Sequence, residues 1–175
     1  MTITVRKAET QDTKILSVLA TEVWLDTYAK DGILKAYADH LLTRYSPAAF
    51  RRYLECSATE VLVSCDADLI LGYAKLTSGS SNVEQRFGPA EVATLYVRRH
   101  HARRGIGGRL LSEALRLATE AGHKSVYVSV YRENHAALAF YQAWGFREIG
   151  TKVAQLSNSE VELCILSVST DRTCR

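Results

Sequence analysis

Apolar and polar residues follow two different periods along the chain, and the period predicts which element each stretch forms. Residues 2–7 alternate between apolar and polar side chains, which is the pattern of a half-buried strand. Apolar residues then recur at three- and four-residue spacing between Ile15 and Trp24, which predicts a helix, and Thr10 is a candidate N-cap for it. Residues 31–56 are interrupted by glycine and proline and predict one or two short helices.

The remainder of the chain predicts strands and helices in turn. The expected elements are strands at 60–65 and 69–77 joined in a hairpin, a loop at 77–89, a strand at 91–98, a helix at 105–121, a strand at 125–131, a helix that begins at Asn134, and a hairpin of strands at 146–156 and 160–168. Antiparallel strands come first and a β-α-β-α unit follows. The fold class is therefore α/β, with one mixed, mostly antiparallel sheet and helices on both of its faces.

The composition is that of a globular protein. With 175 residues, 47% hydrophobic and 23% charged, the chain has the size of one domain, which we place at residues 1–169 with a frayed tail at 170–175. The net charge of +3 is too small to indicate a nucleic-acid or membrane partner. Four scattered cysteines and an N-terminus unlike a signal peptide favour a cytoplasmic chain with reduced thiols. Neither the cysteines nor the histidines have the spacing of a metal site.

The segment most suited to chemistry is a glycine turn between the strand at 91–98 and the helix that follows it. This glycine turn consists of Arg103, Arg104, Gly105, Ile106, Gly107, Gly108 and Arg109. Glycines let the backbone approach a ligand closely, and the first turn of a helix presents unpaired N–H groups to an anion. The flanking arginines add charge-assisted donors, so the turn predicts a phosphate-bearing ligand. The turn fits neither the Walker pattern nor the dinucleotide pattern, and a purely structural helix start is the alternative.

Three motifs in order narrow this prediction. They are L-Y-V-R at 95–98, R-G-I-G-G at 104–108 and N-x-x-A-x-x-F-Y-x-x-x-G-F at 134–146. Together they resemble the GNAT superfamily of acyl-CoA N-acetyltransferases. The resemblance implies a GNAT-like fold with a splayed central strand pair, and acetyl-CoA as the cofactor. The chain departs from the family pattern at Ala102, where the family has Gln or Arg, so Arg103 or Arg104 would supply the missing contact.

The resemblance also assigns cofactor-binding residues. In the family, the pantetheine arm lies between the two splayed strands, and the pyrophosphate lies on the glycine turn. Carried over to this chain, the pantetheine slot is lined by Leu95, Tyr96 and Val97, with Asn134 near the pantetheine end and Phe140 packed against the cofactor.

Amine acetylation needs a base for the ammonium and an acid for the leaving thiolate. Tyr141 matches the usual acid position of the family, and the alternative is a core tyrosine whose hydroxyl is satisfied. Glu91 begins the strand before the glycine turn, where relatives often place a carboxylate that acts through water. The alternative is an exposed Glu at a strand end. Glu133 is a spare candidate with the character of a solvated loop charge.

In the family, the acceptor wall comes from the first two helices and from loops near the C-terminal hairpin, and the acceptor expected here is a small-molecule amine. The residues there are Trp24, Asp26 and Tyr28, in a segment that resembles bacterial PaiA-type spermidine/spermine acetyltransferases. The alternative for the two aromatic residues is a role in the core. Polyamines or amino acids are the expected substrates, with protein N-termini as an alternative. A non-catalytic acyl-CoA sensor is the competing class. Because dimers are frequent among relatives, the resemblance also implies a homodimer.

Overall fold

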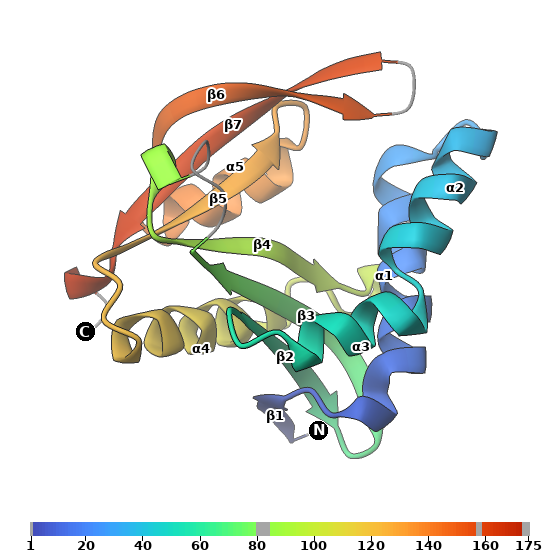
Figure 1. The fold of residues 1–175 in the computed structure, drawn as a ribbon, viewed down its shortest axis with the longest axis horizontal. Coiled ribbons are helices and arrows are strands. Elements are labelled where there is room, and N and C mark those ends of the chain that lie inside the picture. Colours follow the sequence, from blue (N-terminus) through green and yellow to red (C-terminus); the bar gives the residue numbers. More distant parts are fainter. Residues whose placement is uncertain (1, 80–84, 157–158, 173–175) are drawn as a thin grey trace. The chain divides into compact units, whose positions relative to one another are not determined.

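The computed structural model describes residues 2–79, 85–156 and 159–172, and their elements follow the α/β order expected from the sequence (Figure 1). The helices are α1 (Thr13–Tyr28), α2 (Lys35–Arg44), α3 (Pro47–Glu55), α4 (Ile106–Glu120) and α5 (His135–Ala143). The strands are β1 (Ile3–Lys7), β2 (Thr59–Asp66), β3 (Leu69–Ser78), β4 (Ala90–Val97), β5 (Ser125–Tyr131), β6 (Arg147–Leu156) and β7 (Ser159–Ser169). The interrupted stretch at 31–56 therefore holds two helices.

The strands form one seven-stranded sheet in the order β1-β2-β3-β4-β5-β7-β6. β1 pairs antiparallel with β2, and β7 pairs antiparallel with both β5 and β6. β4 pairs with β5 in parallel, through Ala90 with Val126 and Glu91 with Tyr127. The sheet is therefore mixed and mostly antiparallel, as predicted. The parallel register ends at Glu91, although β4 continues to Val97.

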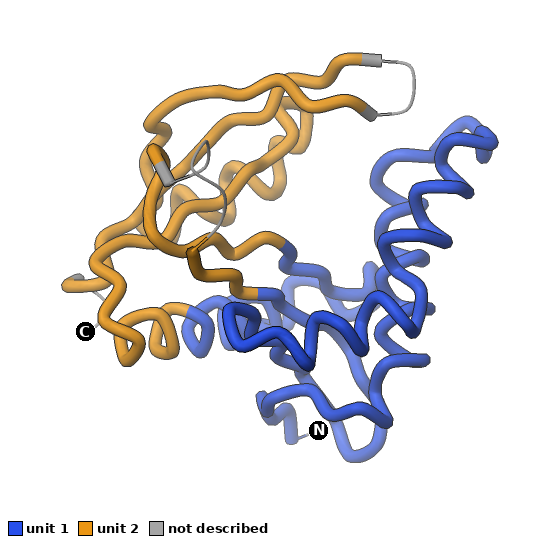
Figure 2. The backbone as a smooth tube through the Cα atoms, viewed as in Figure 1, with its two compact units in different colours: residues 1–75, 94–114 blue, residues 76–93, 115–175 orange. Residues whose placement is uncertain are grey.

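The chain divides into two compact units (Figure 2). Unit 1 comprises residues 1–75 and 94–114, and unit 2 comprises residues 76–93 and 115–175. In unit 1, α1 packs against α3, and α3 packs against β2. Three elements, β3, β4 and α4, begin in one unit and end in the other. A single domain over residues 1–169 stays a prediction.

α4 shows why the helical period predicts this element well. Its apolar stripe is almost fully buried at Ile106, Leu110, Leu111, Ala114, Leu115 and Ala118. Gly122 adopts a φ of +80°, a left-handed conformation that glycine reaches without a steric cost and that ends the helix.

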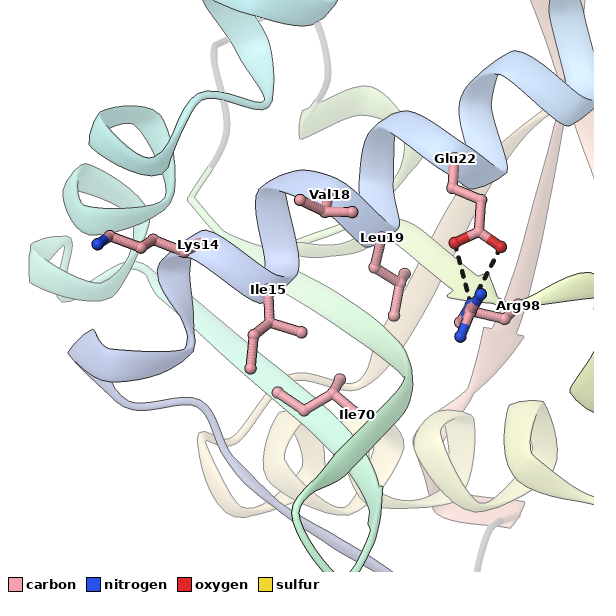
Figure 3. Close-up of a pocket in the computed structure, with 7 residues that line it drawn as sticks. All are labelled: Lys14, Ile15, Val18, Leu19, Glu22, Ile70 and Arg98. Carbon is pink, nitrogen blue, oxygen red and sulfur yellow. Dashed lines mark hydrogen bonds and ion pairs between the residues drawn. The ribbon is translucent and has the colours of Figure 1, made fainter.

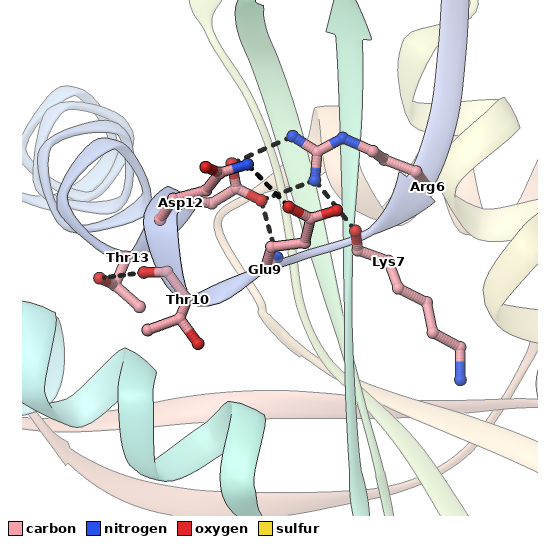
Figure 4. A network of polar contacts seen from close by, with 7 residues as sticks. Arg6, Lys7, Glu9, Thr10, Asp12 and Thr13 are labelled. Atoms are coloured by element: carbon pink, nitrogen blue, oxygen red, sulfur yellow. Dashed lines mark hydrogen bonds and ion pairs between the residues drawn. The ribbon is translucent and has the colours of Figure 1, made fainter.

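The start of α1 differs from the prediction. Thr10 lies in a short 3-10 turn, Thr10–Asp12, rather than at the N-cap of the helix, which begins at Thr13 (Figure 4). Asp12 organises this junction, because its Oδ2 accepts from the backbone N–H of Glu9 at 2.8 Å and from Arg6 Nη1 at 2.6 Å. The prediction was wrong because the turn is capped one residue earlier, at Glu9, where the Asp12 carboxylate accepts from the Glu9 N–H and is itself held by Arg6.

The chain end also differs from the prediction. We expected fraying from residue 170, but Thr170–Arg172 form a 3-10 turn, while residues 173–175 lie outside the described residues. Thr170 is buried and donates its hydroxyl to His123 O at 2.7 Å, which holds the described part of the segment in place. Among the helices described, none is both long and apolar enough to span a membrane.

Candidate active site

The glycine turn lies in unit 1, follows β4 and includes the first turn of α4, and its backbone is shaped for close approach. Arg103 and Gly105 both have positive φ, +61° and +77°. A Cβ built on Gly105 would meet no atom within 4 Å, so space is open at this position. The first bond of α4 runs from Arg109 N–H to Gly105 O at 3.0 Å. By helix geometry, the amides of residues 106–108 therefore have no carbonyl partner within the helix.

The arginines of the glycine turn differ in their surroundings. Arg103 and Arg104 are exposed. Arg109 donates from Nη1 to the carbonyl of Ile3 at 2.9 Å, so it ties the first turn of α4 to β1. The sequence did not predict this contact for Arg109. Exposed guanidinium groups near helix amides that have no partner within the helix can hold phosphate.

Arg98 anchors the start of the segment that leads to the glycine turn. Its Nε lies 3.0 Å from both carboxylate oxygens of Glu22 on α1, and its backbone N–H donates to Leu71 O at 3.0 Å. The ion pair lies at one end of a surface pocket of about 380 Å³, which Figure 3 shows lined mainly by apolar side chains. The lining residues are Lys14, Ile15, Val18, Leu19, Glu22, Ile70 and Arg98. Nothing in the periodicity of the sequence predicted this pairing.

The residues expected to line the pantetheine slot, Leu95, Tyr96 and Val97, are half-buried on β4. The Tyr96 hydroxyl lies 3.3 Å from that of Tyr45, and burial raises the pKa of Tyr96 well above its ordinary value. β3 approaches this part of β4 very closely. A Cβ built on Gly72 would lie 2.6 Å from the carbonyl oxygen of Tyr96, so only glycine fits there without a shift of the backbone.

The three residues expected to bind the acceptor lie on α1 in unit 1, in different environments. Trp24 is 3% exposed and packs in an aromatic cluster, with ring centroids 5.0 Å from Tyr28, 5.2 Å from Tyr37 and 5.4 Å from His40. Tyr28 is half-buried and Asp26 is exposed. Trp24 is therefore a core residue that supports Tyr28, whereas Tyr28 and Asp26 remain accessible.

Unit 2 holds a carboxylate next to a hydroxyl where two strands stop pairing. Glu91 is half-buried on β4, and its Oε1 accepts from the hydroxyl of Ser129 on β5 at 2.9 Å. Sequence reasoning missed Ser129 as an individual residue. The clue to Ser129 is its position on β5. It lies two residues after Tyr127, the partner of Glu91 in the strand register, and alternate residues of a strand share one face.

Tyr141, on α5, is the buried hydroxyl of unit 2. It is 6% exposed and packs against Phe140 and Phe146, with ring centroids 5.2 Å and 5.3 Å away. Burial, and secondarily the negative charge of Glu91, raises the pKa of Tyr141 above its ordinary value of 10. Within the described part of the chain, no hydrogen bond engages the Tyr141 hydroxyl. At neutral pH the hydroxyl is protonated, as it would also be at the ordinary pKa of a tyrosine.

Asn134 begins α5 as the motif suggested. Its side-chain oxygen accepts from the backbone N–H of Ala137 at 3.1 Å, which makes it the N-cap that fixes the start of the helix carrying Tyr141. Phe140 is half-buried beside Trp144, while Glu133 and His135 are exposed. The described residues contain no group of three or more His, Cys, Asp or Glu side chains that could hold a metal ion.

With this geometry in place, comparison with known proteins decides the family. The model of the acetyltransferase (GNAT) family matches residues 24–146. This chain belongs to the GNAT family. The family resemblance noted in the sequence is confirmed, and the family is one of acyltransferases.

Two curated relatives match this GNAT protein over part of its length. An uncharacterised protein of Mycobacterium leprae is 34% identical over 105 residues, 60% of this chain and 28% of the relative. The N-alpha-acetyltransferase RimI of Mycobacterium tuberculosis is 32% identical over 108 residues, 62% of this chain and 65% of the relative. The chain thus matches less than two thirds of the length of either relative.

One solved structure illustrates the fold over nearly the whole chain. It is a PaiA N-acetyltransferase from Thermoplasma acidophilum in complex with coenzyme A, with a TM-score of 0.74 and 22% identity. The match covers 97% of this chain and 99% of that chain. The GNAT-like fold expected from the sequence is therefore confirmed.

Proposed function

We propose that this GNAT protein is an acetyl-CoA-dependent N-acetyltransferase that transfers an acetyl group to a primary amine. The observation that carries the proposal is the pair of groups in unit 2, a half-buried carboxylate, Glu91, and a buried protonated hydroxyl, Tyr141. Amine acetylation needs a group that accepts a proton and a group that donates one, and these two side chains have those characters.

The residues of the glycine turn fit the phosphates of acetyl-CoA. Arg103 and Arg104 are exposed cations, the amides of residues 106–108 lack helical partners, and no side chain fills the space at Gly105. These groups would hold the pyrophosphate, while Leu95, Tyr96, Val97, Asn134 and Phe140 are proposed to contact the rest of the molecule. When bound, acetyl-CoA supplies an acetyl group activated as a thioester.

The chain's own groups would then manage the protons. Glu91 accepts the proton that the acceptor ammonium must lose before its nitrogen has a lone pair. Tyr141 carries a proton that can neutralise a thiolate, since a tyrosine with a pKa of 10 or above is protonated at neutral pH. Both groups are removed from bulk water to different extents, which strengthens their electrostatic effect.

A small amine, polyamine-like or amino-acid-like, is the proposed acceptor. Exposed Asp26 offers a carboxylate and half-buried Tyr28 an aromatic ring, and each of these groups attracts a cation, although residues two apart on α1 face different sides of the helix. The PaiA structure is a fold neighbour and adds no substrate information of its own. A second candidate is the α-amino group of a protein N-terminus, which the 32% identity to RimI favours.

A cytoplasmic homodimer is the proposed form of the protein. The described cysteines, Cys56, Cys65 and Cys164, are all free thiols, which supports a reducing compartment. Light scattering of the purified protein tests the homodimer.

Thiol release from acetyl-CoA tests the function. The panel contains spermidine, spermine, amino acids, an aminoglycoside and a short peptide with a free N-terminus, each run with wild type, Glu91→Gln and Glu133→Gln. We expect turnover with one amine class, a loss of roughly 10²-fold or more in Glu91→Gln, and no loss in Glu133→Gln. Acetyl-CoA binding without turnover on any acceptor would instead support a sensor, and a larger loss in Glu133→Gln would move the base to that residue.

A further inference from the structure

A side-chain hydrogen bond joins β4 and β5 just beyond the last residues that the two strands pair through their backbones. Glu91 lies opposite Tyr127 at the end of the parallel register. Ser129 follows two residues later on the same face of β5, because side chains alternate along a strand. Its hydroxyl reaches back to Glu91 Oε1 at 2.9 Å. A hydroxyl at a neighbouring position of β5 would point to the opposite face of the sheet and would not make this contact.

This contact constrains the Glu91 carboxylate. A serine hydroxyl has one proton to donate, and Ser129 gives it to Oε1. No hydrogen bond from another described residue reaches the Glu91 side chain. Ser129 is therefore its one described hydrogen-bond partner, and it leaves the lone pairs of Oε2 to accept a proton. Without it, a glutamate has three rotatable bonds and would sample several carboxylate positions.

We propose that Ser129 is a positioning residue that fixes the Glu91 carboxylate for proton abstraction from the acceptor amine. This inference rests on the proposed function and deepens it. Ser129 touches Glu91 and acts through it, so its removal should affect turnover rather than the binding of acetyl-CoA. The effect should also vanish when Glu91 can no longer act as a base.

The test is a double-mutant cycle in steady-state kinetics with the amine found by the panel. Ser129→Ala should lower kcat about tenfold, with the KM for acetyl-CoA within about twofold of wild type. Ser129→Thr keeps a hydroxyl at the same position and should restore most of kcat. In a Glu91→Gln background, Ser129→Ala should change kcat by less than about twofold, because residues that act as a unit are not additive.

Ser167→Ala is the matched control. Ser167 also bridges to β5, through a hydrogen bond from its hydroxyl to Val126 O at 3.2 Å, but it does not contact Glu91. The kcat of Ser167→Ala should equal that of wild type. Thermal unfolding of each variant shows whether the variant is folded. An unchanged kcat in Ser129→Ala, or an equal loss with and without Glu91, would overturn the positioning role alone. A wild type that acetylates no amine would overturn the proposed function and the positioning role with it.

Discussion

At the scale of single residues, the environment of Tyr141 decides what its hydroxyl can do. The side chain is buried against two aromatic rings, and Glu91 contributes negative charge nearby. Both effects disfavour the tyrosinate and raise the pKa of Tyr141. A hydroxyl that stays protonated has a proton to donate, but burial raises the pKa of the core residue Tyr73 in the same way, so the acid role remains a proposal that kinetics must test.

Tyr141→Phe should lower kcat by about 10²- to 10³-fold and leave the affinity for acetyl-CoA within about twofold of wild type. Because the pKa of Tyr141 lies above its ordinary value of 10, deprotonation of this residue should cause no alkaline loss of rate below about pH 10. Thiol release across pH and calorimetric titration with acetyl-CoA measure the two effects. Tyr73→Phe removes another buried hydroxyl and serves as the control. An equal loss in both variants would argue for a packing role.

Asp12 is a buried residue whose negative charge is paired with Arg6. Its carboxylate is buried, accepts from the Arg6 guanidinium at 2.6 Å and 3.0 Å, and has a lowered pKa, chiefly because of that contact (Figure 4). A lowered pKa means that the folded state prefers the ionised form. The stability that Asp12 contributes is therefore present above its ordinary value of 3.8 and is lost as the pH falls through the lowered value.

Asp12→Ala should therefore lower the free energy of unfolding by about 2 kcal/mol at pH 7, as expected for a hydrogen bond to a charged group. The difference from wild type should shrink as the pH is lowered below 3.8. Urea unfolding of the two proteins at several pH values measures it, with Asp31→Ala, at an exposed position, as the control. A difference that is independent of pH would show that the Arg6 contact contributes little.

At the scale of elements, periodicity predicted what lies within each helix and strand better than what joins them. The apolar stripe of α4 follows from burial of one helix face, and the β-rich run of β5 follows from burial of the strand, so the bounds of both were predicted within one or two residues. The start of α1 was missed because it depends on Arg6 and Asp12, whose partnership arises only when β1 and the turn come together. Ser129 and Glu22 were missed as partners for the same reason, since each hydrogen-bonds to a residue distant in sequence.

Gly72 shows how one position can set the spacing of two elements. The missing side chain lets β3 approach the Tyr96 carbonyl on β4. Gly72→Ala should lower the free energy of unfolding by about 1–3 kcal/mol, the usual cost of overpacking, since the obstacle is backbone. Gly150→Ala is the matched control, because its Cβ would meet only a Phe87 ring atom at 3.7 Å, an ordinary contact. Thermal unfolding compares the two, and equal effects would contradict the argument from close approach.

At the scale of the whole molecule, shared elements predict that the two compact units unfold together. β3, β4 and α4 each pass from one unit into the other. Unfolding one unit alone would therefore break these two strands and this helix, and only a fragment of each would stay folded. Helix formation is cooperative, and a shortened helix is marginal in water. A single two-state transition is therefore expected.

The two tryptophans allow this to be measured, because Trp24 lies in unit 1 and Trp144 in unit 2. In Trp144→Phe the fluorescence follows unit 1, and in Trp24→Phe it follows unit 2. Within each variant, the denaturant midpoint from fluorescence should coincide with that from far-ultraviolet circular dichroism. Coenzyme A at 100 times its Kd should raise the free energy of unfolding by about 2.7 kcal/mol. Both tryptophan variants should report this increase, even though the glycine turn lies in unit 1 alone. If coenzyme A raised only the Trp24 midpoint, the units would be separate folding domains, and the single domain predicted from the sequence would be wrong.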